Sequence, residues 1–467
     1  MSAAVSGGAD FFRRLMSTPP KPLPTPRLFA LAWPLFLELC LGIAIGVIGT
    51  MLAARISDPA GAAFALANQL AATLFILFRI IGAGISVVIT QALGGGRRAV
   101  ADATARAALG ASTWLGGFTA LMALLFAGPL LRLMNAPAEV LPLSQPFLMA
   151  LAPAMMLDAW NASMASVMRA HLRSRDTLMV LVAMQVAQLL LSVTLMPVLG
   201  LPGFAVALAV SRAFGLGLHV WLWRARLDLR PKASDWWRLQ RAELAGVLHI
   251  GLPGAAENIA YRLAYMVSVA IAGHLGASAL AAHSYTSQLM YFVLLPGLAT
   301  GFAAEIVVGH LIGAGQLHEA HRLVRRALAR GLLISVVVAA GAAAASPWLL
   351  QMFTHDEKIL ASAVVLMWIT VVLEPGRTFN LVVINALRAA GDAKYPVMVG
   401  AGSMLLVLAG GSWLLGEVLG LGLVGLWIAY AADEWIRGLL MWRRWARLGW
   451  VPQARAVHRR LRAARAH

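Results

Sequence analysis

The chain has 467 residues, of which 60% are apolar and only 12% are charged, and its mean hydropathy is +0.77. Soluble globular proteins carry about 25% charged residues, so this composition excludes an ordinary soluble domain and leaves room for a dozen apolar stretches of about 20 residues that each cross a bilayer. One cysteine, Cys40, excludes an internal disulfide framework.

Residues 1–27 are basic and rich in proline, and no cleavage site follows a short apolar core. We therefore expect a cytoplasmic leader and not a removable signal peptide. Six apolar spans follow in a predicted lobe at 28–223, and six more in a second lobe at 246–441. A basic linker at 224–245 separates the lobes, and a basic cytoplasmic tail covers 442–467. The predicted spans are 28–54, 63–92, 107–130, 143–168, 178–199 and 203–223, then 246–273, 281–312, 331–353, 359–386, 396–418 and 420–441.

The two halves repeat each other at a fixed, ungapped offset. Pro34 in WPLFLELCLG and Pro253 in GLPGAAENIA are 219 positions apart (253 − 34), and the same offset pairs Glu38 with Glu257. Rarer residue types match in the same register, namely Gln69 with Gln288, Asn161 with Asn380, and Arg169 with Arg388. The chain is therefore a duplication in which each half places a carboxylate four residues after a proline.

The basic residues lie on alternate connections. Of the 38 Lys and Arg residues, 30 fall on connections that share one side of the membrane, and three fall on the other side. The positive-inside rule then places both termini in the cytoplasm. The two halves begin on the same side, so they are parallel repeats. We expect an all-α membrane protein with twelve transmembrane helices in two parallel-repeat six-helix lobes around a central cavity. The positive charge indicates contact with anionic lipid at the cytoplasmic face, and we expect no nucleic acid as a partner.

Charged groups within spans are costly unless they face protein or water. Glu38 and Glu257 occupy the same depth in each half, which favours a functional role. A carboxyl group in a poorly hydrated cavity has its charged form disfavoured, so it can load a proton on one side and release it on the other. The intramembrane acids are Glu38, Asp158, Glu257, Glu305, Glu374, Asp433 and Glu434.

Glu374 is the third candidate for proton coupling. Arg377 follows it at i+3, so the two residues could form either a gating or binding pair or a structural ion pair. Asp433, Glu434 and Arg437 are typical of a structural network in the last span, and Asp158 and Glu305 carry no assignment.

Several spans turn a polar face away from lipid. Residues spaced 4, 8 and 11 apart share a helix face, and such faces define the predicted substrate cavity. Taken singly, the Ser, Gln and Gly positions are equally typical of contacts between helices. The predicted cavity residues are Asn68, Gln69, Arg79, Tyr261, Tyr265, Ser284, Gln288, Arg377 and Asn380.

No pattern indicates an enzyme or a bound cofactor. The histidines within spans show no metal-ligand spacing, and Gly94–Gly96 is not followed by the Lys-Ser or Lys-Thr of a phosphate-binding loop. We read this glycine run as a helix stop. We therefore expect no metal and no cofactor, with H⁺ as the coupling ion and Na⁺ as the alternative.

Four stretches together resemble the multidrug and toxic compound extrusion (MATE) family, in its DinF-like bacterial branch. They are PLFLELCLGIAIGVIGTMLAARISDPAGAAFALANQL with ITQALGGG, GLPGAAENIAYRLAYM with GHLIGAG, LEPGRTFNLVVINALRAAGDAKYP, and DEWIRGLLMWRRW. The resemblance implies two lobes around a V-shaped cavity and antiport of organic cations or amphiphilic drugs against H⁺ or Na⁺.

This chain departs from the family pattern at two positions. It has Gly49–Thr50 where the family usually has Asp-Thr, and Arg377 where some members have Asp. The first departure suggests that Glu38, on the same helix face, replaces the missing proton carrier. The second favours H⁺ over Na⁺.

We therefore expect an antiporter in the bacterial inner membrane that exports hydrophobic, cationic small molecules by alternating access and works as a monomer. One alternative is a Na⁺-coupled exporter. Another is a lipid-linked oligosaccharide flippase of the same superfamily, which a strongly basic cavity would favour. A membrane-embedded enzyme or a scaffold is the alternative from another class.

Overall fold

This computed structural model describes residues 28–134 and 136–463, apart from the side chains of residues 75–77 and 79–81. The predicted leader at 1–27 lies outside the described residues. The described chain is helical and contains no strand. The first lobe consists of α2 (Leu28–Ala54), α3 (Asp58–Gly94), α4 (Arg98–Leu125), α5 (Ala127–Leu133), α6 (Leu141–Ala150), α7 (Ala152–Ala170), α8 (Ser174–Leu199) and α9 (Leu201–Leu227).

The second lobe follows a short connection that contains η1 (Ala233–Trp236). Two π-helical segments, η2 and η3, interrupt its fifth span, which is the eleventh of the chain. The lobe consists of α10 (Arg241–His274), α11 (Ala277–Gly313), α12 (Leu317–Leu350), α13 (Glu357–Ala389), α14 (Lys394–Ser403), η2 (Met404–Ala409), α15 (Gly410–Trp413), η3 (Leu414–Val418) and α16 (Gly422–Ala446). A last helix, α17 (Val451–Ala463), lies beyond it.

Local signals set several helix ends. The Ser57 hydroxyl accepts a hydrogen bond from the Ala60 amide at the start of α3, and the Asp356 carboxylate caps α13 through the Lys358 amide. The C-terminal ends of α3 and α11 are followed by Gly96 and Gly315, which have positive φ and occupy matching positions in the two repeats. The predicted helix stop at the glycine run is therefore confirmed.

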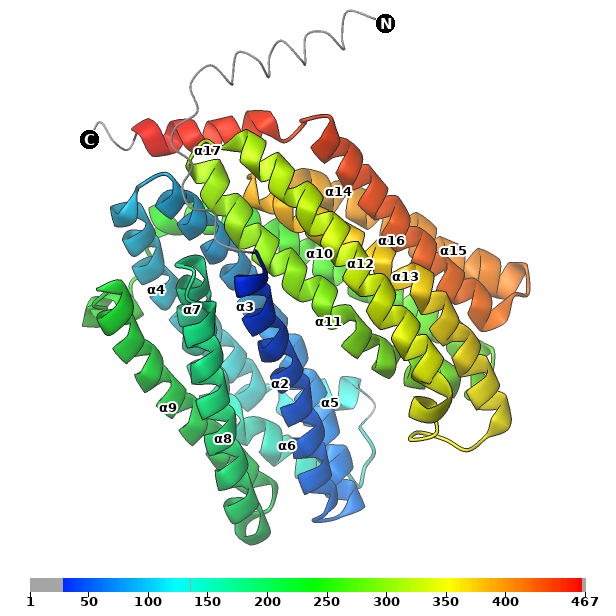
Figure 1. Ribbon diagram of the computed structural model, residues 1–467. Coiled ribbons are helices and arrows are strands. Elements are labelled where there is room, and N and C mark those ends of the chain that lie inside the picture. Colours follow the sequence, from blue (N-terminus) through cyan, green and yellow to red (C-terminus); the bar gives the residue numbers. More distant parts are fainter. Residues whose placement is uncertain (1–27, 135, 464–467) are drawn as a thin grey trace, which may run out of the picture.

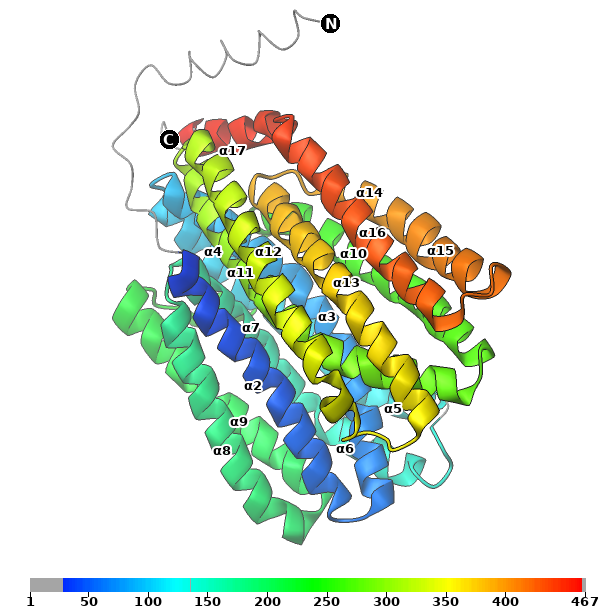
Figure 2. The same cartoon turned by 45° about the vertical axis from the view of Figure 1, so that its right-hand side comes forward.

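The described residues form twelve membrane-crossing segments in two lobes. Eight segments qualify as membrane spans by length and composition alone, with Lys394–Val418 counted as one. The other four are α3, the divided span α6–α7, α10 and α16, and these carry many of the buried polar and charged side chains. In Figures 1 and 2 the two lobes lie side by side, and α17 crosses one end of the molecule, called the α17 end below.

The lobes contact each other mainly through α2 and α3 of the first lobe and α10 and α11 of the second. Leu31 and Leu35 of α2 are buried in the same apolar core as residues of α11 and α13. The first turns of α2 are therefore held against the second lobe, and this placement brings Glu38, one turn further along, to the junction of the lobes.

Two crossed hydrogen bonds join the lobes near the α17 end. Gln91 of α3 donates to the Ala389 carbonyl at the end of α13 over 2.8 Å, and His310 of α11 donates to the Ala170 carbonyl at the end of α7 over 2.9 Å. The repeat offset of 219 relates both the donors (310 − 91) and the acceptors (389 − 170). The two bonds are thus equivalent under the internal symmetry of the chain.

Glycine allows this close approach. A Cβ atom on Gly94 would collide with the His310 carbonyl of the facing lobe, and one on Gly313 would collide with the Gln91 carbonyl. These two glycines are also 219 positions apart (313 − 94). The lobes are consequently packed backbone against backbone at the α17 end.

Candidate functional site

A cavity of about 620 Å³ lies between the two lobes. Helices α2, α3, α7, α8 and α9 line it from the first lobe, and α10, α11 and α13 line it from the second. Its volume is typical of sites for drug-sized molecules. The charged and titratable residues in its wall are Glu38, Asp158, Arg169, Arg212, His219, Glu305 and Arg388.

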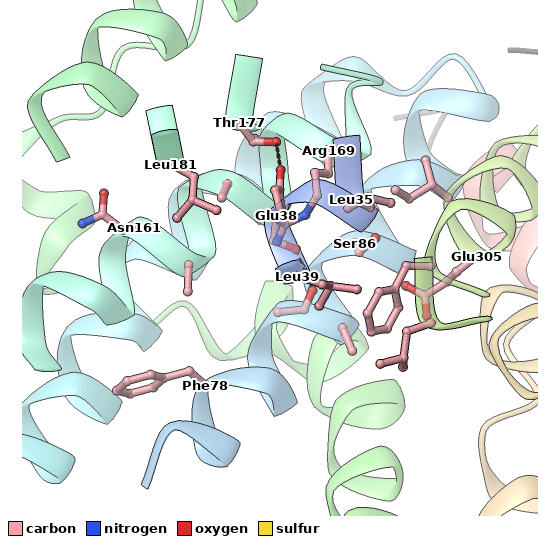
Figure 3. Close-up of a pocket in the computed structure, with 18 of the residues that line it drawn as sticks. Leu35, Glu38, Leu39, Phe78, Ser86, Asn161, Arg169, Thr177, Leu181 and Glu305 are labelled. Carbon is pink, nitrogen blue, oxygen red and sulfur yellow. Dashed lines mark hydrogen bonds and ion pairs between the residues drawn. The ribbon is translucent and has the colours of Figure 1, made fainter. Parts of the chain in front are cut away.

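Glu38 is held at the edge of the cavity by two neighbours. Its carboxylate accepts a hydrogen bond from the Arg169 guanidinium over 3.0 Å and another from the Thr177 hydroxyl over 2.6 Å (Figure 3). Arg169 stands in the last turn of α7 and Thr177 in the first turn of α8. The carboxylate therefore ties α2 to two other helices of its own lobe.

The second lobe repeats this arrangement. Arg388 of α13 donates to the Glu257 carboxylate of α10 over 2.6 Å. Both ion pairs join residues 131 positions apart, and the repeat offset relates one pair to the other. Glu38 and Arg388 line the cavity, and Glu257 lies directly behind Arg388.

A second polar group lies in the first lobe between α7 and α9. Asp158 forms an ion pair of 2.7 Å with Arg212. Asn161 donates to the Arg212 backbone carbonyl, and its side-chain oxygen accepts a hydrogen bond of 2.9 Å from Nδ1 of His219. Because the amide nitrogen of Asn161 already faces carbonyl groups, His219 carries its proton on Nδ1.

Glu305 differs from the other acids in the cavity wall. It lies on α11, is only 5% exposed, and among the described side chains has no Lys, Arg or His nitrogen within 4.0 Å of its carboxylate. Ser86 of α3 lies beside it, and the two residues occupy equivalent positions in the repeats (305 − 86 = 219). Equivalent residues that meet in this way lie on the axis that relates the two lobes.

The charges of this site do not cancel. The lining carboxylates, together with Glu257, which is bonded to a lining arginine, number four, and the arginines of the wall number three. With neutral His219 and ionised acids, the described side chains of the site carry one excess negative charge, and among them Glu305 is the acid without an ion pair. Bound monovalent positive charge would balance the site, whether it comes from a proton or from a larger cation.

A second charged cluster is buried inside the second lobe and does not line this cavity. Arg377 bonds Glu374 over 2.7 Å and Glu434 over 3.1 Å, and Arg437 bonds Glu434 and Asp433 over 2.9 and 2.8 Å. Asn380 also donates to Glu434. This network fastens α13 to α16, in line with the structural role predicted for Asp433, Glu434 and Arg437.

The remaining predicted cavity residues lie elsewhere. Tyr261 packs on Arg437 with 5.9 Å between the guanidinium carbon and the ring centre, and Tyr265 stacks on Tyr430 inside the second lobe. The side chain of Arg79 falls outside the described part of the chain. Four polar residues are exposed on the halves of α3 and α11 remote from the α17 end, namely Asn68, Gln69, Ser284 and Gln288.

Sequence reasoning gave no role to four side chains of the wall. Asp158 and Glu305 were visible as intramembrane acids, but nothing in the sequence indicated a partner for either. Arg169 and Arg388 were visible as a repeat-matched pair, but their place in basic connections suggested a topological role. Their spacing of 131 residues from the two matched glutamates was the available signal.

The fold and the cavity together define a class of protein. Two similar six-helix lobes that meet around a polar cavity within the membrane form a secondary transporter, because rocking one lobe against the other exposes the site to each side in turn.

Comparison with known proteins narrows the class to a family. The MatE family model matches residues 34–194 and 253–413, which are two segments displaced by the repeat offset of 219. The chain belongs to the MatE family. It is 31% identical to the uncharacterized transporter YisQ of Bacillus subtilis over 92% of this chain and 96% of that protein. It is 22% identical to the multidrug resistance protein PmpM of Pseudomonas aeruginosa over 80% of each chain.

Solved structures agree on the fold. One is an outward-facing conformation of a multidrug resistance MATE family transporter, with a TM-score of 0.83, 17% identity, and coverage of 91% of this chain and 96% of that one. A MOP superfamily transporter from Pyrococcus furiosus, described as having a binding pocket of reverse polarity, matches with the same score, identity and coverage. The predicted family and the two-lobed fold of twelve helices are thus confirmed.

Proposed function

We propose that the chain exports hydrophobic cations from the bacterial cytoplasm in exchange for protons, across the inner membrane. The observation that carries this proposal is the single excess negative charge of the described side chains around a drug-sized cavity between the lobes. A monocation and a proton neutralise such a site equally well, so each displaces the other, and this competition is the basis of antiport. Relatives named as multidrug resistance proteins support the substrate class.

Orientation follows from the basic connections. The turn after α3, the turn after α11 and α17 meet at the α17 end through the Arg97–Leu461 and His458–Gly313 hydrogen bonds. The positive-inside rule places such a basic end in the cytoplasm. The lobes are joined there, so on this proposal the closed end faces the cytoplasm, the side on which the sequence predicts both termini. Anionic lipid at this face is a proposed partner, and we propose that the transporter works as a monomer.

The coupling role of Glu38, Glu257 and Glu374 stays a proposal. Each of these carboxylates is bonded to an arginine, so protonation of any one of them would release its partner. In the two matched pairs this release would free the ends of α7 and α13, where the crossed hydrogen bonds between the lobes also end. Protonation there would therefore loosen the cytoplasmic closure.

Two alternatives fit the cavity less well. A lipid-linked oligosaccharide carries pyrophosphate, which requires an excess of basic groups, whereas this wall has an excess of acid. The Na⁺-coupled alternative is disfavoured because this chain has Arg377, bonded to Glu374 and Glu434, where some members of the family have an Asp. Both considerations support an exporter of cations that is coupled to H⁺.

The test is accumulation of ethidium by everted membrane vesicles under separately imposed gradients. A pH gradient with the vesicle interior acidic should drive ethidium uptake. A Na⁺ gradient of equal size, with the higher concentration inside the vesicles, should not. Vesicles from cells that lack this transporter give the background uptake. Uptake driven by Na⁺ alone would overturn the choice of ion, and uptake driven by neither gradient would overturn the proposed exchange.

A further inference from the structure

Glu305 is the acid of the cavity wall with the least to hold it in its charged form. Among the described residues, Glu38 and Asp158 each have an arginine nitrogen within hydrogen-bonding distance, whereas Glu305 has none within 4.0 Å. Ser86 provides a hydrogen bond but no positive charge, and a buried carboxylate without a counterion is costly. The cost disappears when the group binds a proton or a cation.

The helices packed on α11 bring few charged groups near Glu305. Of the helices packed on α11, α2 contributes Glu38 to the wall and α3 contributes Ser86. From α13 comes Arg388, and α10 holds its partner Glu257, while α12 and α17 contribute nothing to the wall. Arg169 of α7 is the other nearby charge. Because both arginines are bonded to their own glutamates, Glu305 sits among neutralised pairs.

Position adds a second argument. Glu305 interacts with its repeat counterpart Ser86, which places the two residues at the axis between the lobes, and Figure 3 shows both in the wall of the pocket. Contacts on this axis are the ones that rocking of the lobes must change. Binding of a proton or a cation at Glu305 therefore changes the contacts at the junction of the lobes, which opens and closes during transport.

We propose that Glu305 is the carboxylate for which the proton and the cationic group of the substrate compete. This inference rests on the proposed H⁺-coupled export and identifies its exchange site, which sequence reasoning left unassigned. No other residue of the described wall combines an unpaired carboxylate with a place on the axis.

The experiment uses purified protein in proteoliposomes and two variants, Glu305→Gln and Glu305→Asp, with Glu357→Gln as the control because Glu357 is an exposed acid outside the cavity. Binding of rhodamine 6G is measured by fluorescence polarisation from pH 6 to 9, and H⁺ release is measured when the dye is added. In the wild type, dye binding should weaken at least about tenfold as pH falls. Glu305→Gln should bind with one affinity at every pH and release no proton.

The outcomes separate the two proposals. A wild type that shows no dependence on pH would overturn the exchange itself. A wild type that couples, with a Glu305→Gln variant that couples equally, would overturn only the assignment of Glu305. If the Gln variant does not fold, the Asp variant decides. It should keep coupling with a displaced pH midpoint, and an unchanged midpoint would count against Glu305.

An independent observation concerns α17, which contacts both lobes at the α17 end. Arg97, after α3 of the first lobe, donates to the Leu461 carbonyl over 2.8 Å, and His458 donates to the Gly313 carbonyl of the second lobe over 3.0 Å. Val451 and Ala454 belong to an apolar core of the second lobe, whereas Leu461 packs on a core of the first lobe.

We infer that α17 is a brace that holds the lobes together while this end is closed. Opening this end moves the lobes apart, so α17 must leave one of them. At the Leu461 end the contacts with the first lobe are the hydrogen bond from the Arg97 side chain and the packing of the Leu461 side chain, whereas Val451 and Ala454 are buried in a core of the second lobe. The Leu461 end is therefore the part that separates. The inference holds whatever ion drives transport.

Reversible cross-linking tests the brace. In a Cys40→Ala background, Arg97→Cys and Leu461→Cys are joined by a short bifunctional methanethiosulfonate, with the two single-cysteine variants as controls. Ethidium transport should fall at least about tenfold on cross-linking and return after reduction, while the controls keep their activity. Transport that continues in fully cross-linked protein would show that α17 need not release the first lobe.

Discussion

Glu38 and Arg169 form an ion pair of 3.0 Å that spans 131 residues of the chain, and Glu257 and Arg388 form the same pair in the second lobe. In each case a carboxylate in the first span of a lobe holds an arginine at the end of its fourth. The pairs stand where the ends of α7 and α13 accept the hydrogen bonds that join the lobes. They connect the cavity wall to the closure at the α17 end.

Breaking one of these pairs should destabilise the protein more than removing both partners. Arg169→Gln leaves Glu38 partly buried without its counterion, and we expect a loss of about 1–3 kcal/mol in the free energy of unfolding. The double variant Glu38→Gln/Arg169→Gln should lose less, because it strands no charge. Denaturant unfolding in detergent micelles measures both. Equal losses would mean that the pair does not act as a unit.

Gly94 should be intolerant of any side chain. Gly94→Ala places a methyl group against the His310 carbonyl, so the lobes cannot close at the α17 end. Ala83 lines the cavity, so Ala83→Cys reports access to it. When Gly94→Ala is added, this cysteine should become several-fold more reactive towards an impermeant maleimide in everted vesicles than it is with Gly94 in place. Gly117→Ala is the control, since no atom lies within 4 Å of its Cβ position. Unchanged reactivity in both variants would argue against a backbone-to-backbone closure.

The buried cluster of the second lobe should dominate its stability. Arg377→Met leaves Glu374, which is fully buried, and Glu434 without a shared counterion, at an expected cost of about 3–5 kcal/mol. Arg322→Met removes an exposed pair with Glu319 and should cost less than about 1 kcal/mol. Thermal unfolding compares the two, and similar losses would refute the structural role of the cluster.

Cysteine labelling checks the orientation. His355 lies in the exposed turn between α12 and α13, at the end remote from α17, and Arg460 lies on the exposed face of α17. In the Cys40→Ala background, His355→Cys should react with an impermeant maleimide in intact spheroplasts. Arg460→Cys should react only in everted vesicles. The reverse pattern would place the α17 end outside the cytoplasm.

The duplication could be predicted because sequence register alone carries it. The ungapped match of Pro34 with Pro253 gave the offset at which the family model also matches. The site could be predicted only in part. The sequence shows which residues share a helix face, but not which neighbouring helix that face contacts. The polar stripe that begins at Glu257 therefore did not reveal that Tyr261 and Tyr265 pack within their own lobe.

The ion-pair partners of the buried acids were the part of the site that could least be predicted. The partner of a buried acid is set by how separate helices meet, as with Glu38 and Arg169 or Asp158 and Arg212. Glu305 lacked a match in the repeat because its counterpart is Ser86, so the comparison of the halves passed over it. The tail from residue 442 was predicted as basic, but the helix within it follows from Val451, Ala454 and Leu461 packing on two cores.

The exchange of one cation for protons through a site with one excess negative charge is the central claim. It is tested most directly by the change in external pH when a hydrophobic cation such as rhodamine 6G is added to lightly buffered proteoliposomes that hold the wild-type protein, in the absence of Na⁺. Prompt acidification that saturates with dye and is missing from protein-free liposomes is the predicted result. Saturable dye uptake without any movement of protons would contradict it.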